Sequence, residues 1–283
     1  MKSFSALALL ASLPFFLSGK AQATTTSINT GSLGATANGT NSNSVTLGTP
    51  GAVSAGGDQS VGYPAGGGNT TIPFLAALNP SAGSSFSIEF WANPSASDND
   101  DAIVSNRFTA GANRSGWIFF QRAAGTGWNF RMYNGVGSGL GWDLTGGTSN
   151  LNTWNHVVAT WNGSAALLYV NGILADSTND GAATGVYNPN TLANSPIFSI
   201  GANADVSSAT TSLADEVAFY NSALTPAQIL NHFTLASSPT AGTYYGAVLA
   251  DGATLQLSNA PEPSSVLFLG LGGLALLRRR ARA

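Results

Sequence analysis

Acidic side chains are the first candidates for chemistry in this chain, because hydrolysis of a glycosidic bond needs two carboxyl groups that flank the bond. On a strand, such a pair would stand at alternating positions. No predicted strand of this chain carries two alternating acids: Glu89 stands alone, and the aspartates of residues 98–101 fall in a loop. His156 and His232 belong to unrelated predicted elements, and the chain has no cysteine. The residues therefore argue against hydrolysis, thiol chemistry and a cysteine-based metal site.

The C-terminal end carries a second pattern with a chemical meaning. A Pro-Glu-Pro motif precedes 12 residues without a polar side chain, Val266 to Leu277, and an arginine cluster follows. Such a run is shorter than the ~20 residues that usually span a bilayer, and a cationic end holds a translocating chain with its C-terminus in the cytoplasm. We interpret residues 261–283 as a sorting tail, with a short transmembrane segment at 264–277 and a basic end at 278–283. Its motif residues are Pro261, Glu262, Pro263, Arg278, Arg279 and Arg280.

This tail resembles the PEP-CTERM signal of Gram-negative bacteria. The resemblance implies a transient insertion in the inner membrane and a membrane protease of the exosortase type as a partner. The N-terminus agrees with export, because residues 1–23 have a basic start, an apolar run and a small-residue cleavage site, Ala21-Gln22-Ala23. These are the parts of a secretory signal peptide for the Sec pathway. We therefore expect a protein of the cell surface or the extracellular matrix.

The charge between the two ends excludes one class of partner. Only 8% of all residues are charged, and the net charge of the whole chain is −3. Between residues 24 and 260, however, four arginines face twelve acidic residues, which gives a net charge of −8. An acidic domain without lysine lacks the electrostatic footprint of a nucleic-acid-binding protein.

The elements between the ends are predicted to be strands, and the clearest are in the segment from Trp154 to Asp176. Val157, Ala159 and Trp161 fall on one face of an extended chain, with the intervening residues on the other. Asn162-Gly163 and Asn171-Gly172 separate three such runs, and Asn-Gly is the strongest short signal for a hairpin turn of type I′. This segment is predicted to be a three-stranded meander.

Other runs extend this all-β pattern. Residues 85–91 alternate between apolar and other side chains, which predicts a half-buried strand. Three Gly-Trp pairs, at Trp117, Trp128 and Trp142, each open a short β-prone run. A single helix is predicted from Pro226, with Thr225 as its N-cap. Residues 24–43 show no apolar periodicity and are interpreted as a flexible lead-in.

Three ordered motifs resemble those of laminin-G-like domains, which belong to the concanavalin A-like lectin/glucanase group. They are the W-x-H-V-x-x-x-W-x-G run from Trp154, the L-Y-V-N-G hairpin from Leu168, and the D-E-V-x-x-Y run from Asp215. The resemblance implies a two-sheet antiparallel jelly-roll sandwich over residues 44–236. A short helix would follow the last core strand, and the tail would form a C-terminal hydrophobic helix. Residues 237–260 are either a linker or a terminal strand.

The resemblance also implies candidate binding residues. Laminin-G-like domains often hold one calcium ion through carboxylates and backbone carbonyls, which suit a hard cation. Asp58, Asp205 and Asp215 are the candidate ligands here, and the alternative is that they are solvated loop acids. The indole rings of Trp117, Trp128 and Trp142 are candidates for a sugar-stacking face, although most aromatic residues of a sandwich belong to its core.

The function that these features favour is a non-enzymatic binding or adhesion module, associated with a glycan or an exopolysaccharide. Two alternatives stay open. One is a glycan-active enzyme on the same fold, a glycoside hydrolase or a polysaccharide lyase, because a fold by itself defines no activity. The other is a purely structural matrix protein with no discrete ligand.

Overall fold

A computed structural model describes residues 26–54, 57–96, 100–122, 127–179, 183–191, 198–203, 207–238, 240 and 242–258. The predicted signal peptide at 1–23 and the sorting tail at 261–283, with its transmembrane segment and hydrophobic helix, lie outside these residues. Within the described ranges, no helix is long and apolar enough to cross a membrane.

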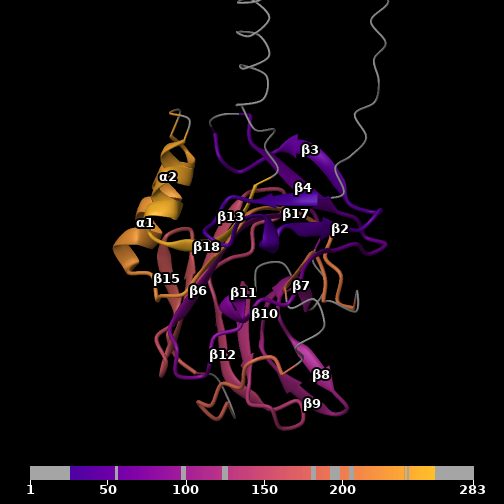
Figure 1. Cartoon of the computed structure of the whole chain (residues 1–283), viewed down its shortest axis with the longest axis vertical. Coiled ribbons are helices and arrows are strands. Elements are labelled where there is room, and N and C mark those ends of the chain that lie inside the picture. The colour runs from indigo at the N-terminus through magenta and orange to yellow at the C-terminus, as the bar shows by residue number, and fades with distance from the viewer. Residues whose placement is uncertain are drawn as a thin grey trace, which may run out of the picture.

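Two layers of antiparallel strands form the body of the molecule (Figure 1). In spatial order the first layer consists of β3 (Thr46–Pro50), β4 (Gln59–Tyr63), β17 (Ser212–Tyr220), β6 (Phe86–Pro94), β13 (Asn155–Trp161), β14 (Ala166–Val170) and β15 (Ile173–Asp176). The second layer consists of β12 (Leu140–Gly146), β11 (Trp128–Tyr133), β10 (Trp117–Gln121), β7 (Asp101–Ser105), β16 (Phe198–Ile200), β5 (Thr70–Ile72), β2 (Gly39–Asn41) and β1 (Thr26–Asn29).

Smaller elements complete the fold. β18 (Ala253–Ser258) pairs with both β17 and β1 and so joins the two layers. β8 (Phe108–Ala110) and β9 (Asn113–Ser115) form a separate hairpin. Two short 3₁₀ helices lie at Gly34–Ala37 and Ala76–Leu78. The predicted antiparallel sandwich is thus confirmed.

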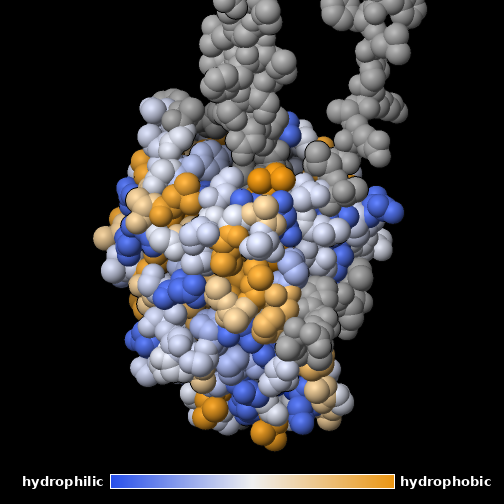
Figure 2. Space-filling view, viewed as in Figure 1, coloured by the Kyte–Doolittle hydropathy of each residue, from blue (hydrophilic) through white to orange (hydrophobic). Residues whose placement is uncertain are grey.

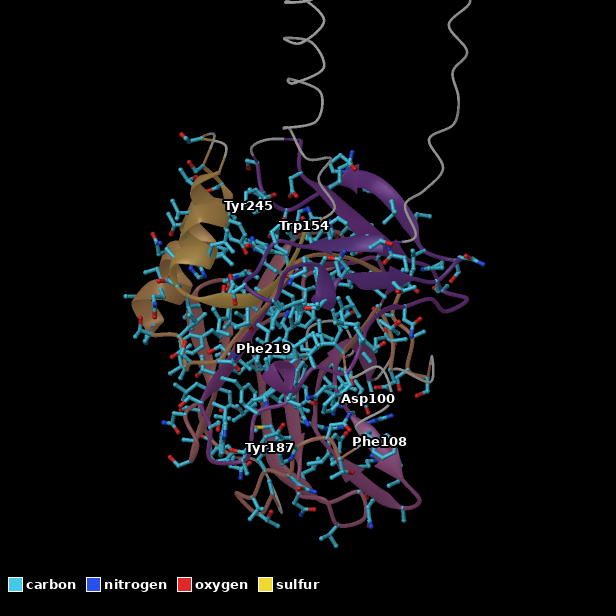
Figure 3. The ribbon with its side chains drawn as sticks, viewed as in Figure 1. Asp100, Phe108, Trp154, Tyr187, Phe219 and Tyr245 are labelled. Carbon is cyan, nitrogen blue, oxygen red and sulfur yellow. The ribbon has the colours of Figure 1, made fainter. Side chains whose placement is uncertain are left out.

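The core lies between the two layers and consists largely of aromatic side chains (Figure 3). Phe90 of β6 meets Phe119 of β10 with ring centroids 4.9 Å apart. Trp142 of β12 meets Trp161 of β13 at 5.7 Å. These edge-on contacts cross from one layer to the other, so alternate residues of each strand build one shared core.

The predicted meander is confirmed as β13, β14 and β15, but its two turns differ. Asn171 and Gly172 have φ angles of 52° and 77°, as a type I′ turn requires. Asn162 does not adopt positive φ; its side-chain Oδ1 accepts hydrogen bonds from the backbone N–H groups of Ser164 and Ala165, and the loop spans four residues. The prediction of two equivalent turns was wrong. At Asn162 the chain forms a longer loop, which the hydrogen bonds to the Asn162 side chain stabilise.

Two helices cover the outer face of the first layer. α1 (Pro226–Ala236) begins at the predicted cap, where Thr225 and Gln228 form a reciprocal capping box. α2 (Thr243–Ala250) packs beside it. Because these helices shield the sheet, β6 is buried on both faces, and residues 85–91 do not form the half-buried strand that their alternation predicts.

The ends of the domain also differ from the predicted boundaries. Residues 24–43 are not simply a flexible lead-in, because β1 and β2 lie within them and belong to the second layer. Of the two alternatives for residues 237–260, the terminal strand agrees with β18, and α2, which the sequence does not predict, precedes it. Both layers and the core between them therefore lie within residues 26–258.

Candidate metal centre

The candidate site lies where β17 changes its pairing partner from β4 to β18, between Ala214 and Ala218; we call this place the seam. β17 pairs with β4 over Ser212–Ala214, but with β18 over Ala218–Tyr220. Between these two stretches β17 bulges away from β6, and Glu216 adopts a φ angle of 49°. A bulge places two successive side chains on one side of a strand, which regular alternation would forbid. Asp215 and Glu216 consequently act together.

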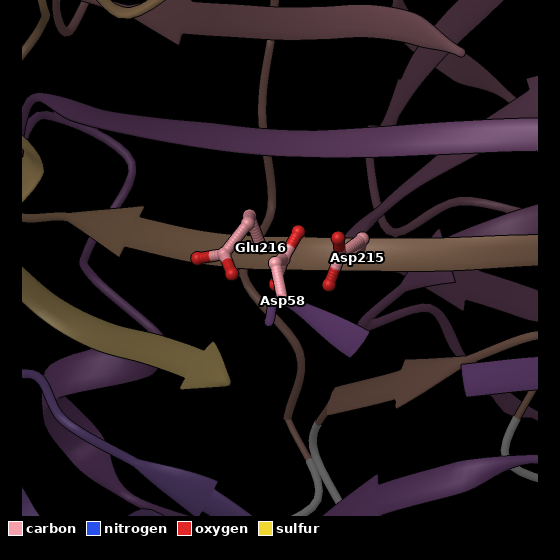
Figure 4. A group of neighbouring side chains, drawn as sticks. All are labelled: Asp58, Asp215 and Glu216. Carbon is pink, nitrogen blue, oxygen red and sulfur yellow. The ribbon is translucent and has the colours of Figure 1, made fainter. Parts of the chain in front are cut away.

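Asp58 completes a group of three carboxylates at this seam, because it immediately precedes β4 (Figure 4). One oxygen from each of Asp58, Asp215 and Glu216 lies within 4.8 Å of the others. All three residues are buried, with 7%, 1% and 1% of their surface exposed. Three acids have thus been withdrawn from water into one small volume.

Backbone and side-chain donors satisfy part of this group. The backbone N–H of Val53 donates to Oδ2 of Asp58, and that of Ala52 donates to Oδ2 of Asp215, each at 2.8 Å. The Tyr245 hydroxyl donates to Oδ1 of Asp58 at 3.0 Å. Two oxygens, Oδ1 of Asp215 and Oε1 of Glu216, have no hydrogen-bond partner among the described residues.

The charge of the group is equally incomplete. Within the described part of the chain, no arginine or histidine forms an ion pair with any of the three acids. Burial raises the pKa of the Asp215 carboxyl well above its ordinary value, and repulsion from Glu216 and Asp58 raises it further. Burial and repulsion from Asp58 likewise raise the pKa of Glu216. The group is therefore stable only if it binds protons or a cation.

A calcium ion fits the donor set. Calcium prefers carboxylate and carbonyl oxygens at about 2.3–2.6 Å, so opposite ligands lie up to about 5 Å apart. The residue opposite the acids is Gly51, and a Cβ atom there would collide with the carboxylates of Asp58 and Asp215. Glycine therefore leaves room for the Oδ2 atoms of Asp58 and Asp215, which accept the hydrogen bonds of Val53 and Ala52.

Sequence reasoning found two of these three residues. The structure brings the predicted ligands Asp58 and Asp215 together, while Asp205 lies outside the described residues. Glu216 was missed, because adjacent residues of a regular strand point to opposite faces. Only the Asp-Glu pair itself, an unusual sequence for a buried strand, was available as a signal.

A second buried acid, Glu89, lies on the same face of the first layer. Its Oε1 is 2.8 Å from Nε2 of His156, and its Oε2 is 3.0 Å from Nδ1 of His232. The hydroxyls of Tyr220 and Tyr244 donate to it at 2.7 and 3.3 Å. Glu89 and both histidines are fully buried, so this group joins β6, β13, β17 and both helices.

This network corrects one prediction. Glu89 is still the only acid of its strand, but the two histidines are not unrelated, because α1 carries His232 across the sheet to the acid that His156 also contacts. Burial alone would raise the pKa of Glu89, but hydrogen bonds from both histidines outweigh it and lower that pKa. Burial by itself would lower the pKa of His232. The pKa is nevertheless raised, because Glu89 contacts Nδ1 and Asp251 Oδ2 lies 2.9 Å from Nε2.

The predicted sugar-stacking tryptophans lie in the core. Trp117 and Trp128 have no exposed surface, and Trp142 is 9% exposed. Each packs against aromatic residues between the layers. Buried indole rings offer no face to a soluble sugar, so the structure does not support this ligand face.

Comparison with known proteins agrees with the observed fold. The profile of the laminin G type, described as the concanavalin A-like lectin/glucanases superfamily, matches residues 64–230. The PEP-CTERM protein-sorting motif matches residues 259–282. No curated protein matches the chain.

Solved structures of similar fold include two toxin domains. The binding domain of Paraclostridial Mosquitocidal Protein 1 is 18% identical, with a TM-score of 0.52 over 74% of this chain and 51% of that one. The binding domain of Botulinum Neurotoxin serotype G is 14% identical, with a TM-score of 0.53 over 74% of this chain and 50% of that one. The chain thus spans about half the length of these structures, and at such identities the likeness shows the fold alone.

Proposed function

Because the chain belongs to the concanavalin A-like lectin/glucanases superfamily and carries a PEP-CTERM sorting motif, we propose that it is a calcium-dependent glycan-binding protein without enzymatic activity. The motif marks an exported protein that is sorted to the cell envelope or surface and processed by an exosortase-type system. Export through the Sec pathway and residence in an exopolysaccharide matrix are parts of the proposal.

The burial of the clustered acids carries the choice of binding over catalysis. A glycosidase needs two carboxyl groups that its substrate can reach. Of the acids that come together, Asp58, Asp215, Glu216 and Glu89 are at most 7% exposed. The more exposed ones, Asp100, Asp143 and Asp251, are each paired with an arginine or a histidine. The four buried side chains serve the fold and a small cation, and a polysaccharide has no access to them.

The metal centre would brace the protein next to a surface groove. Asp58, Asp215 and Glu216 would hold the calcium ion, which would neutralise their charge and fasten the backbone around Ala52 and Val53. An open groove of about 310 Å³ lies on β4, β6 and β17. Leu213, in this groove, is two residues from Asp215 and so shares its face of the strand. The ion and the groove are therefore structurally connected.

The groove offers the chemistry that sugars need. Its lining includes Asn93, Ser95 and Asn152, whose amides and hydroxyl can exchange hydrogen bonds with sugar hydroxyls. Leu213 adds an apolar surface for the carbon face of a sugar ring. Such a mixture of a few polar groups around an apolar surface is typical of a ligand site.

A glycan array with purified residues 24–260 tests this function. We expect binding to a defined subset of glycans in calcium and weaker binding after chelation, with Asn93→Ala reducing the calcium-dependent signal. Release of sugar fragments from any bound glycan would favour the enzyme alternative. Absence of binding across the array would favour a purely structural matrix protein.

The sorting tail is tested on the native protein. Mass spectrometry of the surface-bound form should find a C-terminus upstream of Ala283, because exosortase-type processing removes the apolar segment. Deletion of residues 261–283 should release a folded domain, and replacement of the three arginines 278–280 with serine should impair retention without changing its stability. A native C-terminus at Ala283 would instead identify the tail as a permanent anchor.

A further inference from the structure

Positive charge is confined to one part of this acidic domain. All four arginines between residues 24 and 260 lie in the interval 107–131. The wider stretch 102–142 contains no acidic residue, whereas twelve acids are distributed over the rest of the domain. This stretch includes the hairpin β8–β9 together with β10 and β11, and β9 contacts β11, so the four arginines belong to neighbouring elements (Figure 1).

Two of the arginines are already neutralised. Arg122 forms an ion pair with Asp100, and Arg131 Nε lies 3.2 Å from Oδ1 of Asp143. The Arg131 guanidinium also lies over the ring of Phe120, 5.3 Å from its centroid. These contacts hold both side chains on the outer face of the second layer and leave them little free charge.

The other two arginines are on the hairpin. Arg107 immediately precedes β8, and Arg114 lies in β9; both are partly exposed. Neither forms an ion pair with another described residue. The Arg114 guanidinium lies over the Tyr133 ring, 5.9 Å from its centroid, which orients it without consuming its N–H donors. The hairpin therefore presents two uncompensated guanidinium groups.

Backbone hydrogen bonds attach the hairpin to the neighbouring loop. The Arg114 N–H donates to the carbonyl of Gly137 at 2.8 Å, and its carbonyl accepts from the Gly135 N–H at 3.0 Å. The hairpin is thereby fastened to the loop between β11 and β12, while residues 109–113 at its tip are exposed. Figure 3 places Phe108 of β8 at this end of the molecule, and Figure 2 shows hydrophilic and hydrophobic residues mixed there.

We propose that the hairpin β8–β9 binds an acidic polysaccharide, with Arg107 and Arg114 pairing with its carboxylate or sulfate groups. A guanidinium matches such groups with two parallel hydrogen bonds. The surrounding acidic surface favours a polymer of moderate charge density and repels a denser polyanion such as DNA. The surface lies outside the groove on β4, β6 and β17, and the inference rests on the proposed function in requiring a glycan-binding domain.

The test measures binding of residues 24–260 to polygalacturonate, chondroitin sulfate, neutral dextran and duplex DNA at several salt concentrations. The variant pair Arg107→Gln and Arg114→Gln is compared with a control pair, Asn221→Asp and Asn231→Asp, which changes the net charge equally at exposed positions near α1. We expect the glutamine pair to bind the acidic polysaccharides roughly tenfold more weakly, with a shallower salt dependence, because two charge-assisted contacts are lost. The control pair should bind as the wild type does, and equal thermal midpoints should show that all forms are folded.

Four results would overturn the inference. Equal weakening by both pairs would mean that net charge, and not the hairpin, governs binding. Equal affinity of the wild type for DNA and polygalacturonate would reduce the surface to a general polyanion site. Binding to neutral glycans alone would reject the acidic ligand and leave the proposed function intact, whereas absence of binding to every glycan would reject both.

Discussion

The Glu89 group and the group of Asp58, Asp215 and Glu216 lie buried on the same face of one sheet, but they differ in how their negative charge is compensated. Consecutive residues of α2 contact them: the Tyr244 hydroxyl donates to Glu89 at 3.3 Å, and that of Tyr245 donates to Asp58 at 3.0 Å. Glu89 also has two histidines and a second tyrosine around it. The group of Asp58, Asp215 and Glu216 has three acids, no described base, and two oxygens without a partner.

The difference shows that burial alone does not decide the state of an acid. Around Glu89 the fold itself supplies the compensating donors, and the pKa of Glu89 is lowered. At the seam the fold supplies only part of them, and the pKa values of Asp215 and Glu216 are raised. The first group is complete within the chain. The second requires protons or an ion from outside, which makes it responsive to solution conditions.

The largest expected effect comes from removing the centre of the complete group. Glu89→Ala leaves two histidines and two tyrosine hydroxyls buried without their acceptor, so we expect a loss of about 3–5 kcal/mol in the free energy of unfolding. Glu89→Gln retains the shape and part of the hydrogen bonding and should cost less. Denaturant titrations in calcium and in chelator should give the same losses; a calcium-dependent loss would mean that the two groups are not independent.

Calcium should act on the incomplete group alone. At about a hundredfold excess over its dissociation constant, calcium should raise the free energy of unfolding of the wild type by about 2.7 kcal/mol. Asp215→Asn removes a ligand and an uncompensated charge, so it should lose this gain while unfolding no more easily than the wild type in chelator. Asp176→Asn, on β15, is the matched control. Superimposable wild-type melting curves with calcium and with chelator would contradict the metal centre.

A methyl group at Gly51 should disturb the group of Asp58, Asp215 and Glu216 and leave the Glu89 group unaffected. Gly51→Ala directs its Cβ into the carboxylates of Asp58 and Asp215, so we expect a loss of about 1–3 kcal/mol and a weakened calcium response. At Gly66, a Cβ would meet no atom within 4 Å, so Gly66→Ala should leave stability and calcium response unchanged. Isothermal titration with calcium compares the variants, and an unaltered affinity in Gly51→Ala would place the ion elsewhere.

The smallest expected effect is a dependence on pH. The folded pKa values of Asp215 and Glu216 are raised above their ordinary 3.8 and 4.5. Their contribution to the free energy of unfolding is therefore complete below those ordinary values and is lost as pH rises through the folded pKa. The contribution of Glu89 has the opposite sign: it is present above 4.5 and is lost as pH falls toward its lowered pKa.

Melting curves between pH 5 and pH 8 can isolate the first of these contributions. In chelator the domain should lose stability as pH rises across this window, and calcium should abolish that loss. The raised pKa of His232 produces a loss above its ordinary 6.5 that calcium leaves unchanged, so His232→Gln serves as the control. An identical pH dependence with and without calcium would show that the seam does not titrate.

Local patterns predicted most of the strands. Asn171-Gly172 needs no distant partner to turn the chain, because both residues tolerate positive φ. Thr225 and Pro226 began α1 for similarly local reasons. Prediction failed where burial came from elsewhere in the chain. Residues 26–41 lack apolar periodicity, yet they form β1 and β2 because β18, more than 200 residues away, pairs with β1.

The candidate site shows the same limit. Asp58 and Asp215 were found because the resemblance to laminin-G-like domains places the first and last strands side by side. Glu216 was missed because a bulge reverses the direction that strand alternation assigns to it. The partners of Glu89 were missed because His156 and His232 meet only after α1 folds over the sheet.

The amino-acid sequence by itself determined the alternation of strands, the turn at Asn171-Gly172, the cap of α1 and the sorting motif, because each depends on neighbours within a few residues. The tertiary structure alone decided which acids are compensated. Whether the carboxylates of these two groups meet a histidine, a tyrosine or another carboxylate depends on strand pairing and helix packing, and Glu89 and Asp58 find such partners 67 to 187 residues away along the chain. Such distances leave no periodic signal, since each partner obeys the pattern of its own element.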